Sequence, residues 1–274
     1  MSNLSDFFAT PAVAAEQYPT FFISKSQTFV PPQNGNICIH VIGGGGGGAA
    51  STNNASRSGG GAGYAKKNSQ AVTTSTSIVC VVGAGGNGGW SGNGYNGGSS
   101  TVNISGMTQL VGGAGGAGTA SSTANGGAGS GGDVNTTGGT SQASANAGGG
   151  ACMTTVNAST TNRGAGTNHY STYDGGTAGE TDVIGDFWSS TLGNLAGGKA
   201  GRCMSSGIGG FNEANGGPLS GGGAWSVSSN GSATVHGGNG GIGAGGGRAV
   251  NTGYYQKVRG GDGGDGIIVI QYIP

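Results

Sequence analysis

A cluster of aromatic and polar side chains at residues 169–174 is the part of the sequence best suited to bind a ligand. His169, Tyr170 and Tyr173 could stack on a sugar ring, and Asp174 could accept hydrogen bonds from its hydroxyl groups. Aromatic residues gathered in a loop could equally serve local packing. The sequence therefore leaves sugar binding and packing open as alternative interpretations.

Residues that could perform catalysis do not form a recognisable set. Glycan cleavage needs two carboxyl groups on either side of one bond, and only the tertiary fold could bring such a pair together. The candidate carboxylates are Asp174, Glu180, Asp182 and Asp186. The histidines lie at no diagnostic spacing from an acid or a nucleophile: His40, His169 and His236. We expect no catalytic residues and no enzymatic activity.

Three glycine-rich motifs resemble cofactor or metal sites but lack essential parts. Residues 83–88 fit GxGxxG, yet no helix follows and no acid lies about 20 residues further on. Residues 193–199 have P-loop spacing, but Ala200 replaces the Ser or Thr that would hold magnesium. Residues 260–268 fit a single calcium-binding nonapeptide, a type of site that needs stacked copies. We expect no cofactor and no metal, with Asp262 and Asp265 on the outer edge of a glycine-rich helix.

The elements that must position any site are built largely of glycine, which supplies 69 of the 274 residues. Doublets recur one residue apart, as in residues 112–118, 237–243 and 260–266. Three residues make one turn of a polyproline II helix, so a GGx repeat leaves two edges of such a helix bare. Neighbouring helices can then approach to backbone distance. We expect the glycines to be intolerant of substitution and the third position to be tolerant.

The charge balance narrows the range of partners. Ten basic and ten acidic residues cancel, and charged residues make up only 7% of the chain, so no basic field is available for nucleic acid. Apolar residues make up 33%, which favours a folded and assembled protein over a disordered one. No apolar stretch reaches the roughly 18 residues of a transmembrane helix, and no signal peptide is expected. The four cysteines are expected to be buried free thiols: Cys38, Cys80, Cys152 and Cys203.

Strand signals concentrate at the two ends of the chain. Residues 36–42, 77–82 and 266–273 are rich in β-branched residues and are stopped by glycine or turn residues. His40 alternates with Cys38 and Ile42, which predicts a packed or interface histidine. Shorter signals lie at 21–23, 28–30, 100–104 and 108–111, and the only helical candidate is 12–17. We predict an all-β fold, a β-sandwich of N-terminal and C-terminal strands with glycine-rich polyproline II helices packed as a sandwich.

The chain divides into four segments by composition. Residues 1–19 have almost no glycine and carry Phe7, Phe8 and Tyr18, which predicts a segment that docks onto another chain; a frayed terminus is the alternative. Residues 20–111 form the N-terminal β part. Residues 112–259 form the polyglycine-helix region with aromatic insertions, and residues 260–274 contain the closing strand.

The strand and glycine patterns together resemble a known family. Residues 28–31, 37–46, 59–65, 81–89 and 260–272 look like the glycine-rich domain of bacteriophage tail fibres. The chain is also similar to the receptor-binding adhesins of T-even-like phages, in which stacked polyglycine helices display variable loops to the host. It departs from those adhesins in lacking their long N-terminal attachment domain.

The resemblance implies a virion protein of the tail fibre or tail tip that binds a host surface glycan or outer-membrane protein. It also implies a homo-oligomer, preferably a trimer, attached to other tail proteins through residues 1–19. A purely structural fibre or capsid decoration protein and an ice-binding polyproline II bundle are the alternatives.

Receptor contacts are expected in the insertions, because glycine edges offer no side chain with which to discriminate partners. Binding energy at interfaces concentrates in Trp, Tyr and Arg. Trp188 and Trp225 could instead plug the ends of the glycine sandwich. The candidates are Arg163, His169, Tyr170, Tyr173, Phe187, Trp188, Arg202 and Trp225.

Overall fold

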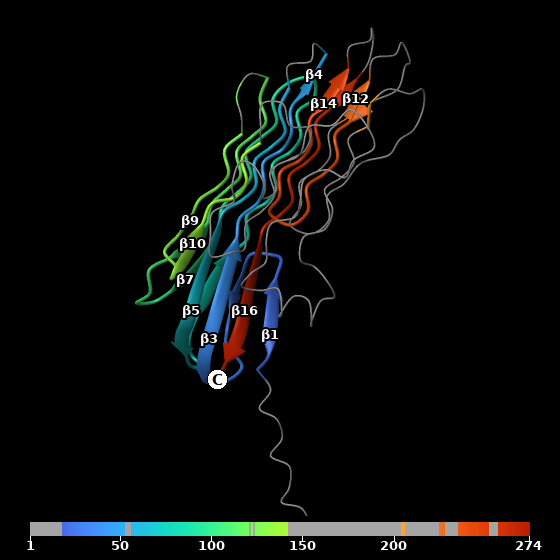
Figure 1. Ribbon diagram of the computed structural model, residues 1–274. Coiled ribbons are helices and arrows are strands. Elements are labelled where there is room, and N and C mark those ends of the chain that lie inside the picture. The colour runs from blue at the N-terminus through green and yellow to red at the C-terminus, as the bar shows by residue number, and fades with distance from the viewer. Residues whose placement is uncertain are drawn as a thin grey trace, which may run out of the picture.

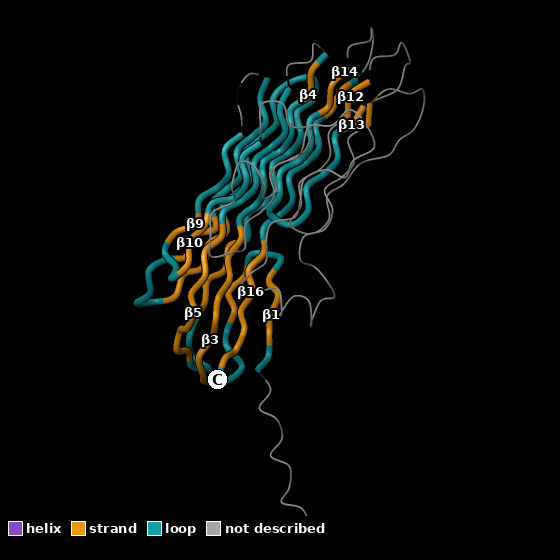
Figure 2. The backbone as a smooth tube through the Cα atoms, in the orientation of Figure 1, coloured by secondary structure: helices purple, strands orange, loops and turns teal. Residues whose placement is uncertain are grey.

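The computed structural model describes residues 18–52, 56–120, 122, 124–141, 204–205, 225–227, 235–251 and 257–274 (Figure 1). None of these residues lies in a helix, so the predicted all-β class is confirmed. The same residues accordingly contain no helix that could cross a membrane. The predicted sandwich of polyproline II helices stays a prediction at that level of detail. Figure 2 shows longer strands gathered at one end and glycine-rich connections extending away from them.

Sheet A brings the two ends of the described chain together. Strand β16 pairs with both β1 and β3, so N-terminal and C-terminal strands lie side by side in one sheet. All strand pairings of sheet A are antiparallel. The sheet has the order β1 (Thr20–Ile23), β16 (Ile267–Ile273), β3 (Gly35–Ile42), β5 (Tyr64–Val72) and β10 (Val134–Thr136).

Sheet B contributes the other wall of an apolar core. In β6, Ile78 and Cys80 are buried while Val79 and Val81 are exposed, the alternation of a strand with one face inside. These inner side chains form one cluster with those of sheet A, including Ile39. Cys38 and Cys80 are buried free thiols, as predicted, whereas Cys152 and Cys203 lie outside the described residues. Sheet B runs antiparallel in the order β2 (Gln27–Phe29), β6 (Ile78–Val81), β7 (Ser100–Ile104), β8 (Leu110–Gly112) and β9 (Gly129–Ser130).

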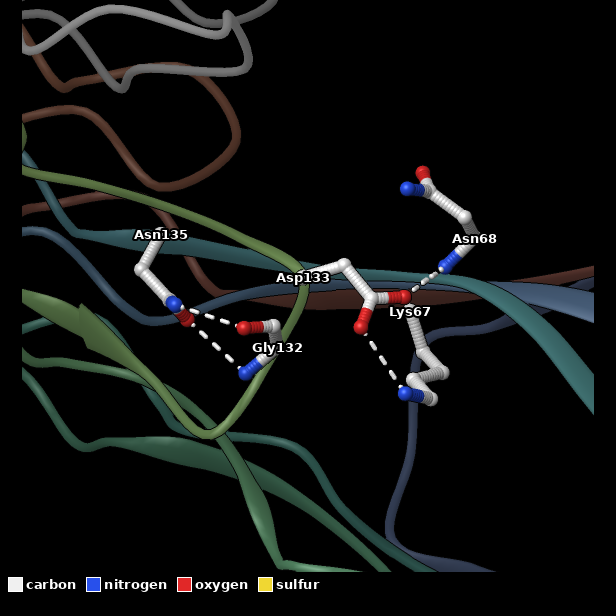
Figure 3. Close-up of polar contacts among 5 residues, drawn as sticks. All are labelled: Lys67, Asn68, Gly132, Asp133 and Asn135. Carbon is white, nitrogen blue, oxygen red and sulfur yellow. Dashed lines mark hydrogen bonds and ion pairs between the residues drawn. The ribbon is translucent and has the colours of Figure 1, made fainter.

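The turn between β9 and β10 is tied to the edge of sheet A by polar contacts (Figure 3). Lys67 Nζ lies 2.8 Å from Asp133 Oδ1, and the backbone N–H of Asn68 donates to Asp133 Oδ2 at 2.8 Å. Within the turn, Asn135 exchanges hydrogen bonds with the backbone of Gly132. The chain thereby crosses from sheet B to sheet A.

The glycine-rich part is organised around residues 43–48, which we call the central run. Its N–H groups point in turn to three antiparallel neighbours, so that every third residue donates to the same run. Three is the period of a polyproline II helix. The first neighbour accepts from Gly43 at the carbonyl of Gly63 and from Gly46 at that of Gly60. The second accepts from Gly44 at Gly98 and from Gly47 at Tyr95, and the third accepts from Gly45 at Gly264 and from Gly48 at Gly261. The two residues after the run continue the pattern, since Ala49 donates to Arg57 and Ala50 donates to Gly92.

The carbonyl groups of the central run accept hydrogen bonds from three further neighbours, which run parallel to it. Gly86 and Gly89 donate from one, Gly115 and Gly118 from the second, and Gly246 and Ala249 from the third. Each residue from 44 to 49 therefore both donates and accepts. Because buried backbone groups must be paired, this bundle satisfies its interior without side chains.

Close approach explains why the central run is unbroken glycine. A Cβ at Gly44 would lie 2.2 Å from the oxygen of Ala84, and one at Gly46 would lie 1.9 Å from the oxygen of Gly116. The central run has neighbouring runs on six sides. No side faces solvent, so no position can carry the side chain of the third residue of a GGx repeat. Runs from the segments 20–111, 112–259 and 260–274 all take part in this bundle.

The end of the bundle farthest from sheets A and B, which we call the distal end, carries short parallel strands (Figure 1). Ala50, Val235, Ala249 and Val258 form a small apolar cluster there. One sheet has the order β11 (Met204–Ser205), β12 (Trp225–Val227), β14 (Ala249–Asn251) and β4 (Ala50–Ser51), and β13 (Val235–His236) pairs with β15 (Val258–Arg259).

Described residues on both sides of the internal undescribed segments lie at this end of the molecule. Ser56 Oγ donates to the carbonyl of Ala249, and Ser141 pairs with Ala124 beside the distal half of the bundle. The other described residues next to these segments lie in or beside β11, β12, β13, β14 and β15. The chain thus enters and leaves these segments at the distal side.

Candidate functional site

An exposed tryptophan stands at the tip of a glycine hairpin at the distal end. The runs 83–89 and 92–98 are antiparallel, with Tyr95 donating to the carbonyl of Asn87 at 2.9 Å. Between them Ser91 adopts a positive φ of 48°, an uncommon conformation for a residue other than glycine. Its N–H donates to the carbonyl of Val258, and Trp90 forms a bridge with Arg259. The hairpin tip is therefore fixed against β15.

Two side chains from other elements contact the Trp90 ring. The His236 ring lies edge-on with a centroid separation of 5.8 Å, and the guanidinium carbon of Arg259 lies 5.8 Å from the Trp90 centroid. A cation at this distance from an indole is attracted by the electron-rich face. Trp90 nevertheless remains 58% exposed. We call Trp90, His236 and Arg259 the Trp90 site.

The charge of Arg259 is balanced within the site. Its guanidinium pairs with the carboxylate of Asp262. The same carboxylate accepts a hydrogen bond of 2.7 Å from the N–H of Gly88, in the hairpin that carries Trp90. Asp262 therefore links the two sides of the Trp90 site and holds the guanidinium in place.

The Trp90 site combines groups that can bind a ligand. It presents an aromatic surface beside the N–H groups of a guanidinium and the two nitrogens of an imidazole. Across the described parts of the chain, no three His, Cys, Asp or Glu side chains gather where a metal ion could be held. Stacking and hydrogen bonding are the interactions this arrangement offers.

The glycine-rich run at 260–266 uses its carboxylates to accept backbone hydrogen bonds. Asp265 Oδ1 accepts the N–H of Gly85 at 2.7 Å, one turn of the run away from the contact of Asp262 with Gly88. Both lie at the third position of a GGx repeat, and Asp265 is exposed as predicted for an outer edge. Asn93, Asn96 and Asn239 accept N–H groups in the same way.

His40 is buried inside the protein, which confirms the prediction of a packed histidine. Its Nδ1 lies 2.8 Å from the hydroxyl of Tyr64 and its Nε2 lies 3.3 Å from Cys38 Sγ. Burial, together with the nearby charge of Lys66, lowers the pKa of His40 to about 3. Burial likewise raises the pKa of the Cys38 thiol, so the pair carries neither a thiolate nor an imidazolium.

Most residues predicted from the sequence to bind a receptor lie outside the described residues, and their role stays a prediction. These are Arg163, His169, Tyr170, Tyr173, Phe187, Trp188 and Arg202, with the carboxylates Asp174, Glu180, Asp182 and Asp186 and the docking residues Phe7 and Phe8.

Two of the predicted residues can be placed. Trp225 begins β12 at the distal end, next to Ala249 of β14. Tyr18 is 38% exposed and lies two residues before β1, at the opposite end of the molecule. The predicted receptor and docking residues that are described thus lie at opposite ends.

The sequence interpretation missed Trp90, Arg259 and the pairing of His236 with an aromatic ring. Trp90 had a usable signal, because it interrupts two glycine-rich runs and is followed by Ser91 and Gly92, the composition of a turn. Arg259 and His236 had no signal in the sequence that linked them to Trp90. They are 169 and 146 residues away from Trp90 along the chain, and only the bundle brings them together.

A family model described as a glycine-rich domain matches residues 23–273, which include sheet B, the bundle and all of sheet A except the first three residues of β1. No curated protein matches the chain.

Proposed function

The chain belongs to the glycine-rich domain family, and we propose that it is a bacteriophage virion protein of the tail fibre or tail tip that binds a receptor on the host surface without catalysis. In this proposal residues 1–19 attach the protein to other tail proteins. The distal end meets a host surface glycan or outer-membrane protein. The protein acts as a homo-oligomer, preferably a trimer.

The main support for this proposal is that the N-terminal segment and the Trp90 site lie at opposite ends of the molecule. Tyr18 lies beside the start of sheet A, and the carbonyl of Pro19 accepts the N–H of Tyr272 near the end of β16. The Trp90 site and the flanks of the aromatic insertions lie at the other end of the bundle. An attachment at one end and a recognition surface at the other is the arrangement that an adhesin needs.

The bundle between the ends is suited to hold such a surface at a fixed distance. Each residue from 44 to 49 is bonded through both its N–H and its carbonyl to a neighbouring run. A scaffold packed this closely at its centre is stiff and can hold its loops in place. Binding residues on loops held by a rigid scaffold are a recurrent arrangement in proteins.

Binding of the purified full-length protein to host cells tests the proposal. We expect saturable binding that competes with adsorption of the intact phage. A matched chain that begins at Thr20 should bind cells equally well but fail to enter particles. Normal particle incorporation and adsorption that is unaffected by excess protein would instead favour a purely structural role.

A further inference from the structure

We propose that the Trp90 site binds one pyranose ring of a surface carbohydrate by stacking it on the exposed face of Trp90. This inference deepens the proposed function, because it gives the chemical class of the receptor.

The exposed indole is an isolated apolar surface among polar neighbours. Among the described residues, the Trp90 ring contacts His236 and Arg259, and the guanidinium of Arg259 pairs with Asp262. The other large apolar side chains that are exposed among the described residues lie elsewhere: Tyr95 in the run 92–98, and Tyr18, Phe22, Val30, Val79 and Val81 in or beside sheets A and B.

The size of this surface favours a sugar over a protein. A stable protein interface buries about 800 Å² on each partner and has a contiguous apolar centre. A single indole surrounded by charged and polar groups offers far less. One aromatic ring does match one pyranose, whose axial C–H bonds form an apolar face of similar area.

Polar groups with unused hydrogen-bonding capacity surround the ring. Within the described part of the chain, the Arg259 side chain forms its polar contact with Asp262, and its guanidinium has further N–H groups that can donate to a ligand. His236 offers one donor and one acceptor when neutral. Hydroxyl groups project from the rim of a pyranose and can donate or accept hydrogen bonds there. Stacking on the face and hydrogen bonds at the rim together define the ligand class.

The site is held in shape before any ligand arrives. The backbone of Trp90 is bridged to Arg259, Ser91 N–H is bonded to Val258, and Asp262 joins Arg259 to Gly88. A ligand therefore meets groups that lose little conformational entropy on binding, which favours even a small sugar.

Titration of the full-length protein with single sugars, followed by the indole N–H signal of Trp90 in NMR spectra, tests the inference. The probes are methyl glycosides of glucose, galactose, mannose, N-acetylglucosamine and rhamnose, each up to ~100 mM, so that binding with a millimolar Kd reaches saturation. We expect at least one sugar to shift the Trp90 signal in a saturable way. Trp90→Ala should abolish saturable binding, Trp90→Phe should weaken it, and Arg259→Lys should lower affinity about fivefold or more.

Tyr95→Ala provides the matched control, because the Tyr95 side chain is 65% exposed and lies on the same hairpin. It should bind the responding sugar with unchanged affinity. The melting temperature of each variant confirms that it folds. Sugar binding without binding to host cells would support this inference and reject the adhesin proposal. Cell binding that Trp90→Ala leaves intact, or the absence of any saturable response of Trp90, would overturn the inference and leave the adhesin proposal standing.

Discussion

Sheets A and B and the glycine bundle are held together by different forces within one chain. In the sheets, side chains such as Ile39, Ile78 and Ile270 leave water and fill a common core. In the bundle, the runs touch backbone to backbone, and the N–H groups of the central run donate to the carbonyls of neighbouring runs. The first region depends on what its side chains are, and the second depends on the absence of side chains. We therefore expect the bundle to be destabilised by added side-chain atoms and the sheets to be destabilised by removed ones.

The largest effect is expected from adding a methyl group to the centre of the bundle. In Gly46→Ala the new Cβ would lie 1.9 Å from the oxygen of Gly116 and 2.5 Å from its carbonyl carbon, both backbone atoms. The runs must separate, so we expect a loss of about 3 kcal/mol or more in the free energy of unfolding. Denaturant titration measures it.

The matched control for this substitution is Ala84→Ser, on an exposed position of an adjacent run. It should change the free energy of unfolding by less than about 0.5 kcal/mol. Equal stability of the Gly46 and Ala84 variants would show that the bundle is not packed at backbone distance.

The sheet core should respond to the opposite change, the removal of side-chain atoms. Ile39 is fully buried in the core of sheets A and B. Ile39→Ala should cost about 2–5 kcal/mol and Ile39→Val about 0.5–1.5 kcal/mol, because the remaining space collapses only in part. Thermal unfolding checks both values. A cost for Ile39→Ala below that of Ile39→Val would contradict a packed core.

Acidification should weaken sheet A through His40. Because burial lowers the pKa of His40 to about 3, the folded protein binds fewer protons there than the unfolded chain, whose histidine has a pKa of about 6.5. The stabilising contribution of neutral His40 is therefore fully present above pH 6.5 and decreases as the pH falls towards about 3. We expect the melting temperature to fall between pH 6.5 and 4, and to fall less in His40→Asn. A steeper dependence in that variant would show that His40 is not the group responsible.

A smaller effect is expected where the third position of a GGx repeat accepts a hydrogen bond. The N–H of Asp262 donates to Asn239 Oδ1 at 2.8 Å. Asn239→Ala should therefore cost about 1 kcal/mol, while Asn239→Asp keeps an acceptor and should cost less. The third position is thus tolerant only where its side chain bonds no neighbour. Unfolding experiments that rank the two variants in the reverse order would disprove this role.

The smallest effect is expected at the surface pair of Figure 3. The hydrogen bond from Lys67 is the main reason that the pKa of Asp133 is lowered, with a contribution from the N–H of Asn68. Both side chains are solvent-accessible, so Lys67→Met should cost only about 0.2–1 kcal/mol, and less at high salt. Chemical denaturation at low and high salt would measure the difference, and a loss that grows with salt would contradict an electrostatic origin.

The sequence alone determined the features that follow from local chemistry. The β-branched composition of residues 36–42 and 266–273 favours extended backbone and predicted two strands, which are β3 and β16. The doublets of glycine predicted runs bare enough to approach one another, because no other residue permits contact between backbones. Alternation placed Cys38 and His40 within a packed strand. These inferences needed only the identity of neighbouring residues and the repeat lengths of a strand and of a polyproline II helix.

Only the tertiary structure decided which run contacts which and therefore where a binding site could form. Gly86, Gly115 and Gly246 are chemically alike, yet each donates to a different carbonyl of the central run. Since glycine has no side chain to distinguish one partner from another, a local pattern carries no information about their pairing. That pairing alone brings Trp90, His236 and Arg259 to one point at the distal end. It also explains why six glycines in succession occupy the centre, where every side of the run is covered.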